Sequence, residues 1–294
     1  MQEHNELAQT DDSQTDTTRL QPMNFTDILD GIFTVYRNHY RLLLEIAAVY
    51  LVLGFAVDLI SAYFIIGATP STIFVIAGFS LMATSVISLL VTAGLMYASA
   101  QVYLTREMTS GAAFQQALRR FWSYLGSGVL YLLAVGGLCI TVIGIPFGIY
   151  FGVRWSLYSL PVLLEESKAW NALGRSTELV KGSWWRVLGI LIAIYLISGM
   201  ITIILYISTE FILTLTGIIA TEQAEGVTGL LDTLRRLFAP TPTEAGWVTY
   251  AVQRFVGLLI ATLTMPIALI GTTLLYFDLR IRKEAFDIEV QVTE

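Results

Sequence analysis

Residues 146–165 read PFGIYFGVRWSLYSLPVLLE, an apolar run of membrane-spanning length with one charge, Arg154, inside it before Glu165 ends it. A helix that crosses a hydrocarbon core of about 30 Å needs about 20 residues. Arg154 lies about eleven residues before Glu165, or roughly 16 Å at the helical rise, so one helix over this run would hold it near mid-membrane. A guanidinium there costs about 2.5–3.5 kcal/mol, and we therefore expect Arg154 to face protein or water rather than lipid.

The composition places the whole chain in the membrane. It is 55% hydrophobic and 14% charged, with a mean hydropathy of +0.67, whereas soluble domains are about 25% charged. We expect one membrane domain over 22–286, between a disordered acidic tail (1–21) and a short C-terminal tail (287–294). Much of the net charge of −6 lies in these tails, and no basic patch indicates nucleic-acid binding. The polar start does not resemble a signal peptide.

Six apolar stretches predict an all-α bundle of about six transmembrane helices. They cover 42–66, 72–104, 126–144, 146–164, 187–219 and 248–277. The sequence Gly144-Ile145-Pro146-Phe147-Gly148 separates the third from the fourth, because proline and glycine favour a tight reversal. The alternative is one kinked helix over 126–164, but it would measure about 58 Å, far more than one crossing.

Basic residues orient the chain. With the N-terminus in the cytoplasm, thirteen Lys and Arg fall on the cytoplasmic side and only Arg235, Arg236 and Arg254 on or near the other. This bias predicts that both termini are cytoplasmic and that 220–247 is the one large outer loop. The thirteen are Arg19, Arg37, Arg41, Arg106, Arg119, Arg120, Lys168, Arg175, Lys181, Arg186, Arg280, Arg282 and Lys283.

A pattern recurs three times along the chain. The segments Phe25–Tyr40, Ser110–Tyr124 and Ser167–Trp185 are each amphipathic, end in aromatic and basic residues, and precede a pair of apolar stretches. We expect three parallel units, each a cytoplasmic interfacial helix followed by a helical hairpin. Ser167 and Gly182 are candidates for the two ends of the third interfacial helix. A smaller amphipathic segment, Val227–Phe238, is expected on the outer surface.

Three parts of the chain carry a family resemblance. Residues 161–165 read PVLLE and lead into ALGRSTELVKG at 172–182; Phe25–Tyr40 stands near the start; and TMP at 264–266 precedes LLYFDLRIRKE at 274–284. Over roughly 22–288, the chain resembles the bacterial membrane-domain family named for its fusion to glycerophosphodiester phosphodiesterases. The resemblance implies a multi-pass protein of the bacterial cytoplasmic (inner) membrane. It does not imply hydrolysis, which belongs to a separate barrel domain rich in metal-binding residues; the only histidines here are His4 and His39.

An intramembrane polar site is the first candidate for function. Arg154 can pair with Glu45, Asp58 or Glu210. Glu45 is favoured because the other two are expected nearer the outer surface, although a local pair with Arg41 also explains Glu45. The sequence leaves open whether Arg154 forms a structural bridge, reaches toward the interface or lines a transport pathway.

The other candidates concern packing and lipid. Gly144, Gly148 and Gly152 recur at four-residue spacing, which lets helices approach closely, within the chain or in a dimer. The single cysteine, Cys139, is expected to act as a small hydrophobe. Candidate contacts with anionic lipid headgroups lie at the end of the third interfacial helix: Arg175, Lys181, Trp184, Trp185 and Arg186.

No catalytic, cofactor-binding or metal-binding motif is present in a plausible context. The preferred hypothesis is therefore a non-enzymatic membrane protein that organises lipid or a membrane partner. The alternative is a small permease with Arg154 in its pathway. A dry bundle with Arg154 neutralised would favour the first, and a water-filled cavity reaching Arg154 would favour the second.

Overall fold

The computed structural model describes residues 22–216 and 246–284, and within these ranges the chain forms helices and no strands. Six helical segments are long and apolar enough to cross a membrane: Tyr40–Ile65, Pro70–Tyr103, Phe121–Cys139, Ile145–Leu164, Trp184–Leu215 and Trp247–Glu284. The prediction of an all-α bundle with six such segments is confirmed. The expected tails, the outer loop and the segment Val227–Phe238 lie outside the described residues.

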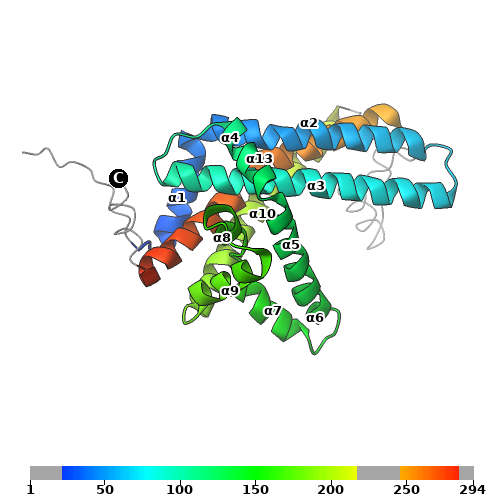
Figure 1. Cartoon of the computed structure of the whole chain (residues 1–294). Coiled ribbons are helices and arrows are strands. Elements are labelled where there is room, and N and C mark those ends of the chain that lie inside the picture. The colour runs from blue at the N-terminus through cyan, green and yellow to red at the C-terminus, as the bar shows by residue number, and fades with distance from the viewer. Residues whose placement is uncertain (1–21, 217–245, 285–294) are drawn as a thin grey trace, which may run out of the picture.

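The first unit follows the predicted pattern. Helix α1 (Phe25–Asn38) precedes the long helices α2 (Tyr40–Ile65) and α3 (Pro70–Tyr103), which lie side by side as an antiparallel hairpin (Figure 1). Asn24 caps α1 in a capping box with Asp27. Pro70 stands in the first turn of α3, where its missing N–H costs nothing.

The second unit departs from regular helices. After α4 (Ser110–Arg119), the outgoing leg is α5 (Phe121–Tyr131), a π-helical turn η1 (Leu132–Gly136) and α6 (Gly137–Cys139). The chain reverses before α7 (Ile145–Arg154). The predicted hairpin is therefore observed, and the alternative of a single kinked helix over 126–164 is not. The returning stretch is not one helix, because α7 ends at Arg154 and α8 (Ser159–Leu164) starts after an intervening turn.

The third unit supplies the centre of the bundle. It consists of α9 (Ala169–Val180), α10 (Trp184–Leu215) and α13 (Trp247–Glu284). Gly182 ends α9 with φ +83°, a conformation that glycine adopts readily. The residue at the N-cap position is Lys168 rather than the expected Ser167. Helix α13 continues through Pro266.

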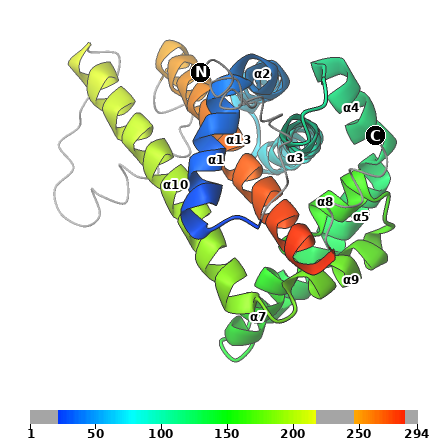
Figure 2. The same cartoon turned by 90° about the vertical axis from the view of Figure 1, so that its left-hand side faces the viewer.

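Helix α13 forms the core of the fold. It packs against α10, α2, α1 and α3, and Figure 2 shows it running between them. Its C-terminal half is buried almost without interruption, including Leu275, Tyr276 and Phe277 at 0% exposure. A helix that is apolar on all sides is stable only when other helices surround it. The charged end of α13 packs against α1, α9 and α10.

Candidate functional site

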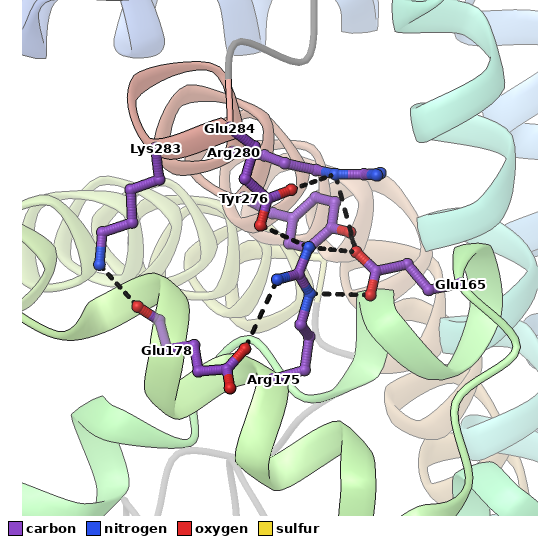
Figure 3. Close-up of polar contacts among 7 residues, drawn as sticks. All are labelled: Glu165, Arg175, Glu178, Tyr276, Arg280, Lys283 and Glu284. Carbon is purple, nitrogen blue, oxygen red and sulfur yellow. Dashed lines mark hydrogen bonds and ion pairs between the residues drawn. The ribbon is translucent and has the colours of Figure 1, made fainter. Parts of the chain in front are cut away.

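A charged cluster surrounds the last two turns of α13 (Figure 3). Tyr276, Arg280 and Glu284 recur every four residues, so they lie on one face of the helix. Glu165, directly after α8, accepts a hydrogen bond of 2.6 Å from the hydroxyl of Tyr276. Arg175 of α9 lies between the two carboxylates, with Nε 2.9 Å from Glu165 and Nη2 2.5 Å from Glu284. The cluster thereby joins α8, α9 and α13.

The cluster neutralises its own charges. Arg280 Nε lies 3.1 Å from Glu284 and 3.7 Å from Glu165, so each of these two carboxylates contacts two arginines. Burial disfavours the charge of Arg175, but its hydrogen bonds to Glu165 and Glu284 outweigh burial and raise the pKa of the guanidinium above its ordinary value. These ion pairs hold α8, α9 and α13 together.

A second charged cluster is centred on Asp278, which is 0% exposed. Its carboxylate accepts hydrogen bonds from Arg186 (2.7 Å), Arg282 (2.9 Å) and the backbone N–H of Met23 (2.8 Å). The same two arginines donate to the carbonyl of Met23 at 2.8 Å each. The start of α1, the start of α10 and the end of α13 are thus fixed at one point.

Arg154 lies at the point where the expected single helix breaks. It is the last residue of α7, and its backbone carbonyl accepts a 2.9 Å hydrogen bond from Ser176 of α9. Its guanidinium contacts Tyr150, with 3.3 Å to the hydroxyl and 5.9 Å to the ring centre. The estimate that Arg154 lies near mid-membrane assumed one continuous helix over 146–165. Because the helix breaks after α7, this assumption does not hold.

The expected acidic partners of Arg154 lie elsewhere. The favoured pair with Glu45 is wrong: Glu45 is exposed, and no carboxylate of the described residues pairs with Arg154. The local pair of Glu45 with Arg41 is also absent, because Arg41 donates to the hydroxyl of Tyr40. Asp58 instead pairs with Arg254 at 2.7 Å, which joins α2 to the start of α13. Glu210, on α10, forms no ion pair with a described residue.

The five proposed lipid-contacting residues fall into two groups. Arg175 and Arg186 are held in the two clusters described above. Trp184 donates its indole N–H to the carbonyl of Tyr150 at 3.1 Å. Lys181 is exposed, and Trp185 is 79% exposed. Only these last two present their side chains outward in the way that headgroup contact requires.

The predicted glycines lie inside the α5–α7 hairpin. A Cβ on Gly148 would clash with the sulfur of Cys139, and one on Gly152 would lie 3.6 Å from the hydroxyl of Tyr131. A Cβ on Gly144 would clash with the carbonyl of Leu138. All three therefore face the outgoing leg of their own hairpin. Cys139 itself is exposed.

Among the open hollows of the described surface are two that Arg154 does not line. One, of about 420 Å³, is lined by Asp30, Phe33, Thr34, Tyr36 and Arg37 of α1. The other, of about 430 Å³, is lined by Tyr50, Thr84, Ser85, Ser88 and Leu89 of α2 and α3. Across 22–216 and 246–284, no group of three or more His, Cys, Asp or Glu side chains is arranged to hold a metal ion.

Sequence reasoning did not select the residues that organise the two clusters, Glu165, Tyr276, Asp278, Arg280 and Glu284, nor Arg254 as the partner of Asp58. A usable signal was present, because two of the quoted motifs place acidic and basic residues directly at the end of apolar stretches. Such charges need partners when the helix end is buried. Which partner each would take depends on how the three units pack, and the sequence does not show this.

The architecture defines a multi-pass α-helical membrane protein. Comparison with protein-family models, with curated proteins and with solved structures gave no match.

Proposed function

We propose that this chain is a non-enzymatic multi-pass membrane protein that organises anionic lipid around its third interfacial helix, α9. The observation that carries the proposal is a pair of exposed aromatic-basic groups, one at each end of α9. Trp170 is 74% exposed beside the exposed Lys168, and Trp185 is 79% exposed near the exposed Lys181. Tryptophan and lysine are the side chains that favour the headgroup layer of a bilayer.

The charge distribution supports this role. Arg175 and Arg186 bind carboxylates of the same chain, so their charges hold the fold together. The exposed lysines present theirs to the surroundings. Near an anionic surface, each such charge contributes about 1 kcal/mol to attraction. A surface of this kind selects lipid by headgroup charge and requires no reaction.

The test compares two surface variants of the full-length protein. Variant one changes Lys168 and Lys181 to Gln and Trp170 and Trp185 to Ala. The matched control changes Tyr63 and Phe74 to Ala, which are 69% and 81% exposed near the α2–α3 turn. Native mass spectrometry after extraction from mixed membranes should show less phosphatidylglycerol and cardiolipin on variant one alone. A folded variant one with the wild-type lipid profile would refute the proposal.

Replacing Arg175 and Arg186 is not a suitable test of lipid binding. Each is bonded to a carboxylate that is buried or half-buried, so its loss strands that carboxylate and lowers stability. A change in bound lipid in such a variant would then report a damaged fold.

A small permease is the second candidate, with a pathway at a different place from Arg154. The hollow beside Tyr50 is lined by the hydroxyls of Thr84, Ser85 and Ser88, in the middle of α3. To test whether water enters it, Ser88→Cys can be compared with the exposed Leu81→Cys, both in a Cys139→Ala background. A charged, water-soluble thiol reagent should label Ser88→Cys faster if the hollow belongs to an aqueous pathway. Equal, slow labelling would leave only the lipid role.

The family and the location are part of the same proposal. The motifs on which the resemblance rests contribute Glu165, Arg175, Tyr276, Arg280 and Glu284 to a single cluster. This convergence supports membership of the membrane-domain family, without its fused hydrolase. Purified protein should accordingly release no glycerol phosphate from glycerophosphodiesters, and measurable release would contradict the non-enzymatic assignment.

Orientation in a bacterial cytoplasmic membrane can be tested with thiols. In Cys139→Ala, single cysteines at Thr228, Ser110 or Thr293 report the loop, the second unit and the C-terminal tail. The positive-inside bias predicts that an impermeant reagent added to intact cells labels only the Thr228 variant. Labelling at Ser110 or Thr293 would reverse the orientation.

A further inference from the structure

The α5–α7 hairpin is long and apolar enough to cross a membrane, but its helices differ from those of an ordinary crossing hairpin. Between Arg120 and Arg154 the sequence contains no charged residue. The outgoing leg, Phe121–Cys139, has 19 residues, and the returning leg, Ile145–Leu164, has 20, but its first helix, α7, ends after 10. At the helical rise, α7 is about 15 Å long, half of a hydrocarbon core. Figure 1 shows this hairpin leaving the bundle at a steep slant to α2 and α3.

Helix α9 and the first residue of α10 lie along the side of the hairpin, which is attached to them at three places. Gly126 of α5 faces Ala169, with 3.4 Å between a Cβ on Gly126 and that of Ala169. The turn after α7 bonds to Ser176. Further toward the tip, Tyr150 bonds to Trp184, and the two rings stack 5.8 Å apart.

These attachments fix the depth of the hairpin, because the attached segment is highly charged. Residues 168–186 include Arg175, Glu178, Lys181 and Arg186. If the hairpin crossed the bilayer, the middle of α7 would lie in hydrocarbon, and so would the nearby exposed Lys181, which forms no ion pair with a described residue. Trp184 also begins α10, beside the Asp278 cluster. The level of Tyr150 is therefore the headgroup level.

The tip beyond this level is short and apolar. From Tyr150 back to Gly144 is about six residues, or roughly 9 Å of helix. The turn exposes Ile140 (85%), Val142 (84%) and Ile143 (82%). One leaflet offers about 15 Å of hydrocarbon, half of the full core. The tip is long enough to enter that leaflet and too short to leave it on the far side.

We propose that the α5–α7 hairpin does not cross the bilayer but inserts into the single leaflet on the side of α9, with lipid acyl chains as the partner of its exposed tip. The other four long apolar helices then form the crossing bundle. This assignment is independent of which lipid headgroups α9 selects.

The broken return leg fits a shallow hairpin. A helix break in hydrocarbon leaves backbone groups without partners, which the bilayer cannot supply. Here Ser176 donates to the carbonyl of Arg154 (2.9 Å) and accepts from the N–H of Leu157 (3.2 Å). The indole of Trp155 donates to Thr177 at 3.1 Å. Helix α9, at the interface, thus supplies hydrogen-bond partners to the backbone groups at the break.

The experiment determines which side of the membrane the tip of the hairpin lies closer to. Single cysteines are placed in full-length Cys139→Ala and carry a nitroxide label: Val142→Cys at the tip, Ala68→Cys in the α2–α3 turn and Gly111→Cys in α4. A side chain at Gly111 meets nothing within 4 Å, so this control leaves the packing intact. The rate of nitroxide reduction by external ascorbate, an impermeant anion, is measured in right-side-out and inside-out vesicles.

For each label, the ratio of the reduction rates in right-side-out and inside-out vesicles shows which side of the membrane the label lies closer to. The tip label should show the same side preference as Gly111→Cys, at a lower absolute rate because hydrocarbon shields it. The Ala68→Cys label should show the opposite preference. A tip label that behaves like Ala68→Cys, or one reduced equally from both sides, overturns the proposal. The two controls calibrate the sides, so the result does not depend on which face is cytoplasmic.

Discussion

The α2–α3 and α5–α7 hairpins are both apolar, but they are built differently. Helices α2 and α3 have 26 and 34 residues and run unbroken, with the charge of Asp58 paired to Arg254 of another long helix. The α5–α7 hairpin contains a π-helical turn, a short return helix and a break closed by α9. Apolar composition predicts that both avoid water. The depth of each hairpin in the membrane depends on which other helices bond to it.

The largest expected effect concerns the long helices. Asp278→Ala removes the common partner of Arg186 and Arg282 and should lower the free energy of unfolding by roughly 3–5 kcal/mol, as for a broken buried ion pair. Thermal unfolding in detergent, followed by near-UV circular dichroism, measures it.

A matched control is Glu178→Ala. Glu178 is also acidic and also pairs with an arginine, but its side chain is 72% exposed and lies 3.6 Å from Arg175. Its loss should cost less than about 1 kcal/mol. Equal destabilisation by the two changes would show that Asp278 does not hold α1, α10 and α13 together.

The next effect concerns the short hairpin. Ser176→Ala leaves the carbonyl of Arg154 and the N–H of Leu157 without their partner, at a cost of roughly 1–3 kcal/mol. Hydrogen exchange should accelerate in 145–158 while α2 and α3 keep their protection. Ser127→Ala is the control, because Ser127 is equally buried but bonds to carbonyls of its own helix turn. Unchanged exchange at the break would show that α9 does not stabilise it.

A smaller effect is expected at Arg154. Its contacts with Tyr150 are those of a half-exposed cation near an aromatic ring, which contribute about 0.5–1 kcal/mol. Arg154→Leu should therefore change the melting temperature little. A loss of several kcal/mol would revive the idea that Arg154 bridges to a buried acid.

Much of the fold could be predicted from the sequence, because hydropathy and helix-end residues act locally. The three interfacial helices, the reversal near Gly144 and the end of α9 at Gly182 follow from such local rules. The position of Arg154 could not be predicted in this way. The break after it is stabilised by Ser176, a residue 22 positions away. Tyr276, which bonds to Glu165, and Arg186, which bonds to Asp278, likewise come from distant helices.

The smallest expected effect is pH-dependent and lies at the base of the short hairpin. Arg120, next to the start of α5, donates a hydrogen bond to Glu166, and with its charge and that of Arg119 it lowers the pKa of this exposed carboxyl below its ordinary value. A carboxyl with a lowered pKa stabilises the fold above its unfolded pKa of about 4.3, and this contribution is lost as the pH falls through the folded pKa. Glu166→Gln should thus melt slightly below the wild type at pH 7, and the gap should close as the pH falls below about 4. In an Arg120→Gln background the gap should be small at every pH. A gap that persists in acid, or that survives without Arg120, would mean that Glu166 contributes through some interaction other than this ion pair.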